Sequence, residues 1–391
     1  MLENIYLRFR QNKFYITIFF ALGIFLRFYV ATFGHNFDFG SYVIVGKIAS
    51  QFGNVYAQTT RYNYGPIWLS ICGCFYNLTA MFNQPLVIYR LLIVGLLTLT
   101  DLGIAAYLLK RCNVLAALIF FLNPVSIIIT GYHNQFDNLA VLLVLLACLF
   151  YNPEERFAKN DFFFILSLSF SLITKHLAIF FLFWIFIRND LPFKKKILYV
   201  GIPAILFLLS FVPFLDGHGL AGILNNVFLY KSRNNFPLLH FFLSKLSIDP
   251  MFYMPIFLTL ICLSGWVFRK IHWQDSILLY LLCFFAFSSA IANQYLAIPL
   301  VALVILTRYT KYVYFLLGGS YLFLQHDGLG FFNLVVQKIP YYCVEGITSR
   351  LISHAYQIAC YIALFTIVKY YLEMNWKKLR LSPNVGQVAP G

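Results

Sequence analysis

The sequence predicts an all-α protein that crosses a membrane many times. Of its 391 residues, 61% are hydrophobic and only 11% are charged, whereas a soluble domain carries about a quarter charged residues. Apolar runs of about 18 or more residues, the length that spans a bilayer as a helix, recur along the whole chain. Strict alternation of apolar and polar residues is absent, which argues against an outer-membrane barrel.

About twelve spanning helices are expected from these runs. The expected spans are 14–33, 86–109, 114–130, 138–151, 161–174, 176–187, 197–215, 251–268, 276–292, 295–307, 312–327 and 350–372. The first run could be mistaken for a signal peptide. It is long enough to span, however, and no small-residue cleavage site follows it, so we expect a retained helix.

Basic residues gather in alternate loops, which sets the expected orientation. Loops rich in Lys and Arg favour the cytoplasm. The residues that would share this side are Arg8, Arg10, Lys13, Lys110, Arg111, Arg156, Lys159, Arg188, Lys194, Lys195, Lys196, Arg269, Lys270, Arg308, Lys311, Lys377, Lys378 and Arg380. Both termini are therefore expected in the cytoplasm. The same loop bias accounts for the net charge of +15 without any binding to nucleic acid.

One apolar segment, 66–82, is expected to lie on the membrane surface rather than to span. Counting it as a span would place Lys110 and Arg111 on the wrong side, and it directly follows a long polar loop. The non-cytoplasmic face then carries two long loops, 34–85 with its surface helices and 216–250. We expect one membrane domain over 1–380 and a disordered tail over 381–391.

Two carboxylates lie where expected spans meet the non-cytoplasmic face, and a charge at this boundary is costly unless it is paired or used. Asp38 follows the first span in the segment His35-Asn36-Phe37-Asp38. Asp137 precedes the fourth span in a second polar segment, 133–138. We expect a cleft at this surface, in which Asp38 takes a proton from an acceptor hydroxyl as a general base and Asp137 is the second candidate.

A phosphate leaving group in such a cleft would need positive charge nearby. Lys231 and Arg233 in the second long loop are the first candidates, ahead of Lys175 and Arg61. Structural alternatives stay open for several of these residues. Asp38 could cap a helix, His133 and Asn134 could serve only the loop, and Lys231 and Arg233 could contact water or lipid headgroups. Asp101, inside a span, is interpreted as a buried helix–helix hydrogen-bonding residue.

Six short segments, in order, carry a resemblance to a known family. They are Phe37-Asp38-Phe39 followed by Tyr42; Tyr62-Asn63-Tyr64-Gly65-Pro66-Ile67; Arg90 to Asp101; Asn123-Pro124 with His133-Asn134-Gln135-Phe136-Asp137-Asn138; Lys175-His176-Leu177-Ala178; and Asn293-Gln294-Tyr295-Leu296 before Pro299. They resemble the GT-C fold glycosyltransferases, and among them the dolichyl-phosphate-glucose glucosyltransferases of lipid-linked oligosaccharide synthesis. The chain departs from that pattern where Gly65 replaces a proline, Gln135 a second histidine and Asp137 a Gln-Tyr pair.

The resemblance implies a GT-C fold and transfer of a sugar from a polyprenyl-phosphate carrier, with Asp38 as the catalytic base. The expected function is transfer of a hexose, glucose or mannose, with inversion, to a lipid-linked or envelope glycan on the non-cytoplasmic face of the bacterial inner membrane or the endoplasmic reticulum. Together with the residues themselves, it gives an expected site of Asp38 and Asp137 for catalysis and His35, Tyr42, Tyr64, His133, Asn134, Gln135, Lys175, His176, Lys231, Arg233, Gln294 and Tyr295 for substrate binding.

No organic cofactor is expected, because the chain has neither a Walker loop nor a dinucleotide-binding GxGxxG segment. A divalent metal stays open, although neither long loop contains an Asp-x-Asp pair. The eight cysteines predict neither a disulfide framework nor a zinc site, since no CxxC pair is present. The expected partners are the lipid-linked donor, the glycan acceptor and membrane lipids.

A flippase or transporter of lipid-linked sugars is the alternative from a different functional class. Such proteins place polar groups near the membrane midplane, on broken helices within internal repeats. The acids of this chain gather at one surface and no repeat is evident, which favours an enzyme. A catalytically inactive scaffold subunit of a glycosylation complex is the third possibility.

Overall fold

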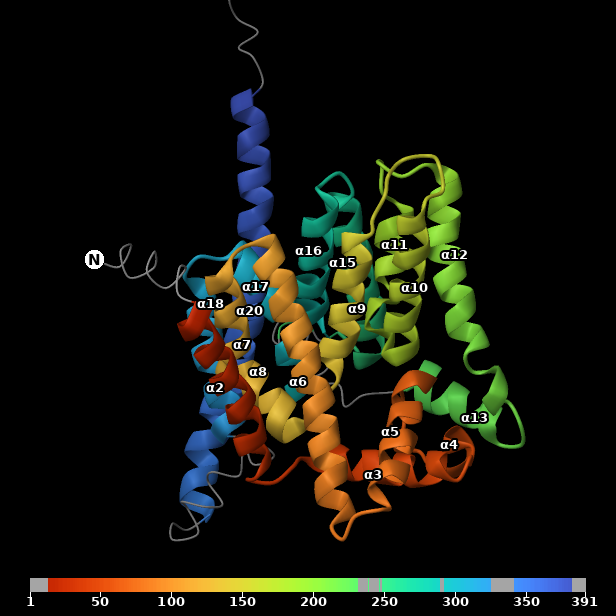
Figure 1. Ribbon diagram of the computed structural model, residues 1–391. Helices are drawn as coiled ribbons and strands as arrows, with labels where there is room; N and C mark the ends of the chain where they lie inside the picture. The colour runs from red at the N-terminus through yellow and green to blue at the C-terminus, as the bar shows by residue number, and fades with distance from the viewer. Residues whose placement is uncertain are drawn as a thin grey trace, which may run out of the picture.

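The computed structural model describes residues 13–230, 238, 246, 248–288, 292–324 and 341–381, without the side chains of 250, 341–353 and 377–381. Over these residues the chain forms 17 α-helices joined by short 3-10 and π turns, and no β-strand. The expected all-α class is therefore confirmed. Figure 1 shows most of the longer helices running side by side in one bundle, while α3 lies across one end of it.

The helices follow one another with short connections. The first third of the chain contains α2 (Lys13–Ala31), α3 (Phe37–Ser50), α4 (Val55–Gln58), α5 (Pro66–Thr79), α6 (Pro85–Arg111), α7 (Val114–Leu122), α8 (Pro124–Ile128) and the π turn η1 (Ile129–His133). The middle contains α9 (Asp137–Leu149), α10 (Lys159–Thr174), η2 (His176–Ala178), α11 (Phe181–Phe186), α12 (Phe193–Leu209), η3 (Val212–Phe214), α13 (Gly219–Ile223) and η4 (Leu224–Phe228). The last part contains η5 (Pro250–Phe252), α15 (Tyr253–Phe268), α16 (Trp273–Phe287), η6 (Asn293–Ala297), α17 (Leu300–Leu306), α18 (Thr310–Leu324) and α20 (Tyr341–Leu381).

Asparagine and proline set several helix starts. The Asn113 side chain accepts a hydrogen bond from the Ala116 N–H at 2.9 Å, and the Asn123 side chain accepts one from the Ser126 N–H at 2.8 Å. Proline is the first residue of α5, α6 and α8, where its missing N–H has no helical partner to lose. These local signals divide an apolar chain into separate helices.

Four helices are long and apolar enough to cross a membrane: Lys13–Ala31, Pro85–Arg111, Phe193–Phe214 and His354–Trp376. Val114–Leu122 and Pro124–His133 would form a fifth span with a bend of 49°. A multi-pass membrane protein fits these helices. The described part of the chain nevertheless contains four or five candidate spans, fewer than the twelve or so expected from the sequence.

The shortfall comes from helix length rather than from missing helices. The expected spans 138–151, 251–268 and 276–292 correspond to α9, α15 and α16, which have 13, 16 and 15 residues. At 1.5 Å per residue these helices are about 20–24 Å long, whereas the hydrocarbon core of a bilayer is about 30 Å thick. The expected spans 176–187 and 295–307 are each divided between a 3-10 turn and a short helix.

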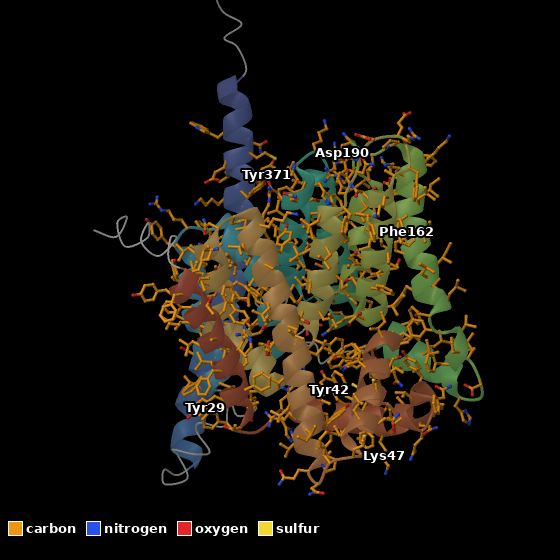
Figure 2. All side chains as sticks on the ribbon, viewed as in Figure 1. Tyr29, Tyr42, Lys47, Phe162, Asp190 and Tyr371 are labelled. Carbon is orange, nitrogen blue, oxygen red and sulfur yellow. The ribbon has the colours of Figure 1, made fainter. Side chains whose placement is uncertain are left out.

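The two ends of the bundle separate segments that were expected on opposite faces of a membrane. Figure 2 shows Tyr42 and Lys47, from the first long loop, at one end, and Asp190 and Tyr371 at the other. The expected surface segment 66–82 contains α5, which has 14 residues, packs against α3 and α6, and is not among the candidate spans.

A buried polar network joins five elements: α2, α6, α8, η1 and α9. The guanidinium of Arg27 on α2 donates from Nε to Asp101 Oδ2 on α6 at 2.9 Å, and both side chains are fully buried. Asp101 also accepts from Ser126 at 3.1 Å, from Thr130 at 2.7 Å and from Asn138 at 2.6 Å. Asp101 is therefore a helix–helix hydrogen-bonding residue, as the sequence interpretation had it.

Candidate active site

Four segments far apart in the sequence meet at the end of the bundle that α3 covers. They are the first turns of α3, the loop before α5, the residues between η1 and α9, and the residue that ends α10. Tyr42 marks this end in Figure 2. Close approach of the backbones makes the meeting possible: a Cβ on Gly65 would lie 1.9 Å from the Ile173 carbonyl oxygen. Only glycine fits there.

Asp38 lies half-buried in the first turn of α3. Its carboxylate oxygen Oδ2 accepts hydrogen bonds from Asn36 Nδ2 at 3.2 Å and from Gln135 Nε2. The helix cap is supplied by Asn36, whose side chain accepts from the Asp38 N–H at 3.1 Å. The capping role weighed for Asp38 therefore belongs to its neighbour, which leaves the Asp38 carboxylate available for another role.

The protonation of Asp38 reflects two opposing influences. Burial raises the pKa of the Asp38 carboxyl above its ordinary value. The positive charge of Lys175 and the hydrogen bond from Gln135 act in the opposite direction. A carboxylate with a raised pKa is a stronger proton acceptor than an ordinary exposed aspartate, which is the property that a general base needs.

Gln135 connects Asp38 to a cluster of aromatic side chains, Tyr42, Tyr64, Trp68 and Phe136. Its Oε1 accepts from the Tyr42 hydroxyl at 3.2 Å while its Nε2 donates to Asp38. The neighbouring Phe136 ring stacks on Trp68 with centroids 4.1 Å apart and meets the Tyr64 ring edge-on at 4.8 Å. The Gln135 side chain is thus held by hydrogen bonds at both its oxygen and its nitrogen.

Asp137 and Lys175 form an ion pair next to the rings of Tyr64 and Phe136. Lys175 Nζ donates to Asp137 Oδ2 at 2.8 Å, and the two side chains are 9% and 0% exposed. The ammonium also lies 4.9 Å from the centre of the Tyr64 ring and 5.2 Å from that of Phe136, within cation–π range. The cation is therefore held by one carboxylate oxygen and two aromatic faces.

Several buried polar atoms beside this pair have no hydrogen-bond partner. They are both ring nitrogens of His133, Oδ1 of Asn134, Oδ1 of Asp137 and Oδ1 of Asn138. Each unpaired buried group of this kind costs about 1–3 kcal/mol. His133 ends the π turn η1, and Asn134 follows in the left-handed conformation with φ of 55°. Turns of this type inside helices are frequent at functional sites.

The remaining expected residues divide into three groups. Gln294 and Tyr295 lie on η6, which packs against η1 and α9, so they belong to the same neighbourhood. His35 is exposed beside Asp38, with its ring 4.6 Å from that of Phe39, and His176 on η2 faces Phe207 at 6.4 Å. Lys231 and Arg233 lie outside the described residues.

The structure places two further arginines near the candidate site, Arg61 and Arg90. Arg61, a minor candidate in the sequence, packs over the Phe37 ring at 4.0 Å, and Arg90 at the start of α6 lies 5.8 Å from the Phe39 ring. These two phenylalanines flank Asp38. Nε of both arginines and one terminal nitrogen of Arg90 are buried without a partner. An arginine in the second turn of an apolar helix was the signal that could have singled out Arg90.

The described residues contain no group of three His, Cys, Asp or Glu side chains that could hold a metal ion. The site instead offers a half-buried carboxylate, a paired lysine, two arginines with free N–H groups and a wall of aromatic rings. Comparison of the chain with protein-family models, with curated proteins and with solved structures finds no significant match.

Proposed function

We propose that this protein is a membrane glycosyltransferase that moves a hexose from a polyprenyl-phosphate carrier to a lipid-linked or envelope glycan. The reaction would take place on the non-cytoplasmic face of the bacterial inner membrane or the endoplasmic reticulum, with both termini in the cytoplasm and the helices in a GT-C arrangement. One observation carries the proposal: the Asp38 carboxylate lies half-buried at one end of the bundle, where it accepts a hydrogen bond from Gln135 and is influenced by the charge of Lys175. Arg61 and Arg90 lie over the rings of Phe37 and Phe39, the two residues that flank it.

The proposed reaction is a single displacement with inversion. Asp38 accepts the proton of the acceptor hydroxyl while that oxygen forms a bond to the anomeric carbon of the hexose. The bond from this carbon to the phosphate oxygen breaks, and the bonding electrons leave with the polyprenyl phosphate. No metal or redox partner is needed for this balance. Tyr64 is partly exposed and could pack against a sugar ring, whereas Trp68 and Phe136 are fully buried and stack on each other.

The leaving phosphate would be stabilised by positive charge that is ready before the reaction. Among the described residues, Lys175 already holds Asp137 at 2.8 Å, whereas Arg90 has buried N–H groups without a partner. We therefore assign Arg90 the first contact with phosphate and Lys175 a second. Lys231 and Arg233 remain candidates from the sequence.

A transporter of lipid-linked sugars is the second candidate, and one observation favours it. The apolar pair Val114–Leu122 and Pro124–His133 bends by 49° just before the ion pair of Asp137 and Lys175. Broken helices beside buried charges are typical of transporters. The two functions differ in whether a glycosidic bond is broken.

The test uses the full chain purified in detergent, as wild type and as Asp38→Asn. Each is incubated with polyprenyl-phosphate glucose or mannose and a membrane lipid extract, and donor and product are followed by mass spectrometry. We expect turnover by the wild type and a loss of about 10²–10⁴-fold in the variant, the usual contribution of a general base. Asp216→Asn, at an exposed aspartate bonded to Asn54, is the matched control and should keep full activity.

If the lipid-linked donor stays intact with every acceptor fraction, the proposed transferase function is contradicted. Movement of the same intact donor across liposomes that contain the protein would then establish the transporter. Full activity of Asp38→Asn would leave an enzyme in place and move the base to Asp137.

A further inference from the structure

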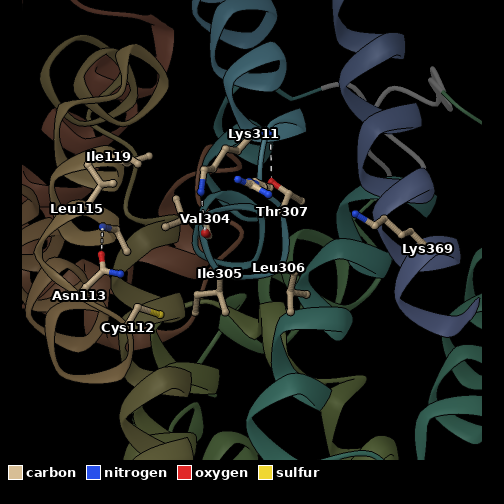
Figure 3. Close-up of a pocket in the computed structure, with 12 residues that line it drawn as sticks. Cys112, Asn113, Leu115, Ile119, Val304, Ile305, Leu306, Thr307, Lys311 and Lys369 are labelled. Atoms are coloured by element: carbon tan, nitrogen blue, oxygen red, sulfur yellow. Dashed lines mark hydrogen bonds between the residues drawn. The ribbon is translucent and has the colours of Figure 1, made fainter. Parts of the chain in front are cut away.

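A second binding feature lies at the other end of the bundle. A cavity of about 430 Å³ opens where α6 ends, α7 begins, α17 gives way to α18 and α20 passes (Figure 3). Its distance from the candidate active site follows from α6. Arg90, near that site, lies close to the start of this helix, and the cavity residue Cys112 lies just beyond its end. These 22 residues correspond to about 33 Å of helix. One phosphate cannot contact both sites.

The cavity carries positive charge without acidic residues in its described lining. Its cations are Arg308 between α17 and α18, Lys311 in the first turn of α18, and Lys369 on α20. Lys311 Nζ donates to the Val304 carbonyl at 3.3 Å, which leaves two of its three N–H groups for another partner. Lys369 has one long ion pair, with Glu373 at 3.7 Å, and both of these side chains are more than half exposed. Such exposed pairs hold a cation weakly.

The cavity also has an apolar lining. Leu115 and Ile119 on α7 and Leu306 at the end of α17 line it, and Figure 3 shows Leu115 and Ile119 on one side of Lys311 and Leu306 on the other. A site that combines three cations with an apolar wall fits a ligand that is anionic at one end and apolar at the other. Basic pockets between membrane helices bind phosphate-bearing lipid headgroups for this reason.

We propose that this cavity binds the phosphate of an anionic membrane lipid, with the first carbons of its acyl chains along Leu115, Ile119 and Leu306. Free phosphate shares the charge but would leave the apolar wall unused. The cavity also lies at the end of the bundle that the basic loops assign to the cytoplasm, and anionic lipids are enriched in that leaflet. The proposal does not depend on glycosyl transfer at the other end.

The test measures lipid binding by native mass spectrometry on the full chain, titrated with phosphatidylglycerol or phosphatidylcholine. The variant is Arg308→Gln with Lys311→Gln. The matched control, Lys194→Gln with Lys196→Gln, removes the same charge at the same end of the bundle but outside the cavity. We expect phosphatidylglycerol to bind the cavity variant at least tenfold more weakly, or 1.4 kcal/mol. The control should match the wild type.

Arg308→Gln alone provides a check on folding, because this side chain is exposed and lies between α17 and α18 rather than within a helix. It should weaken binding with an unchanged unfolding midpoint. Equal weakening in the control and cavity variants would overturn the proposal, since the effect would then be general surface charge. Phosphatidylcholine that binds as tightly as phosphatidylglycerol would also overturn it. Competition by inorganic phosphate as strong as that by added phosphatidylglycerol would overturn the lipid part and assign the cavity to a soluble phosphate.

Discussion

Two buried ion pairs lie next to each other in this protein and are built differently. Arg27 meets Asp101 at 2.9 Å and Lys175 meets Asp137 at 2.8 Å, and all four side chains are less than a tenth exposed. The two pairs share one short segment. Asn138 donates to Asp101, whereas the preceding residue, Asp137, turns to Lys175.

The difference lies in what surrounds each pair. Both oxygens of Asp101 accept hydrogen bonds, and Arg27 also donates to the Gly23 and Phe121 carbonyls at 2.9 Å. Around Asp137, one carboxylate oxygen and both nitrogens of His133 have no partner. A satisfied network stabilises a fold, and an unsatisfied one costs free energy unless a ligand completes it. We infer that the first pair is scaffold and the second belongs to a binding site.

The largest expected effect on stability comes from breaking the satisfied pair. Arg27→Met leaves the Asp101 charge buried and uncompensated, which should cost about 3–5 kcal/mol. The double variant Arg27→Met with Asp101→Asn should recover part of this loss, because no unpaired charge remains. Unfolding of the purified protein in detergent by increasing denaturant measures both. Additive losses in the double variant would argue against a coupled network.

The second expected effect concerns the pH dependence of turnover and Lys175, the cation of the second ion pair. Asp38 can accept a proton only when it is ionised, so the rate should fall as pH drops through its pKa, which burial raises above the ordinary value of about 3.9. The charge of Lys175 lowers this pKa. Lys175→Met should therefore move the acid side of the pH–rate profile to higher pH.

The profile of Lys195→Met gives the control, since Lys195 pairs with Asp161 at 2.8 Å elsewhere in the bundle. Its acid side should coincide with that of the wild type. An unmoved profile in Lys175→Met would show that this lysine does not act on the base.

A smaller effect is expected from the hydroxyl of Tyr42. Tyr42→Phe removes the donor to Gln135 Oε1, and a hydrogen bond of this kind contributes about 0.5–1.5 kcal/mol. Turnover should fall by about two- to tenfold. Tyr199→Phe, which removes a hydroxyl bonded to Asp161, is matched in chemistry and should leave turnover unchanged. A rate loss as large as that of Asp38→Asn would make Tyr42 itself a reacting group.

The sequence predicted the helices better than their lengths. Hydropathy located α6, α12 and the apolar part of α20 within a few residues. It could not show that the expected span 114–130 bends at Asn123-Pro124 or that a π turn follows, because a hydropathy window averages composition and contains no backbone geometry.

The candidate site was predicted in part for a similar reason. Asp38, Gln135 and Asp137 stood out as polar residues at the ends of apolar runs. The pairing of Asp137 with Lys175 joins residues 38 positions apart, and Arg27 lay inside the first apolar run without any local sign of its partner on α6. Such pairings arise only when separate helices pack together.

The different roles of the two ion pairs are tested most directly by comparing Asp101→Asn with Asp137→Asn. The free energy of unfolding and the turnover of donor are measured on the same preparation of each variant. Arg27 cannot lose its proton, so Asp101→Asn should lose about 3–5 kcal/mol of stability. In Asp137→Asn, the charge of Lys175 still has the Asp38 carboxylate nearby, so this variant should remain folded. It should nevertheless lose turnover. The contradicting result is Asp137→Asn unfolding like Asp101→Asn, or keeping full turnover, since the two pairs would then have the same role.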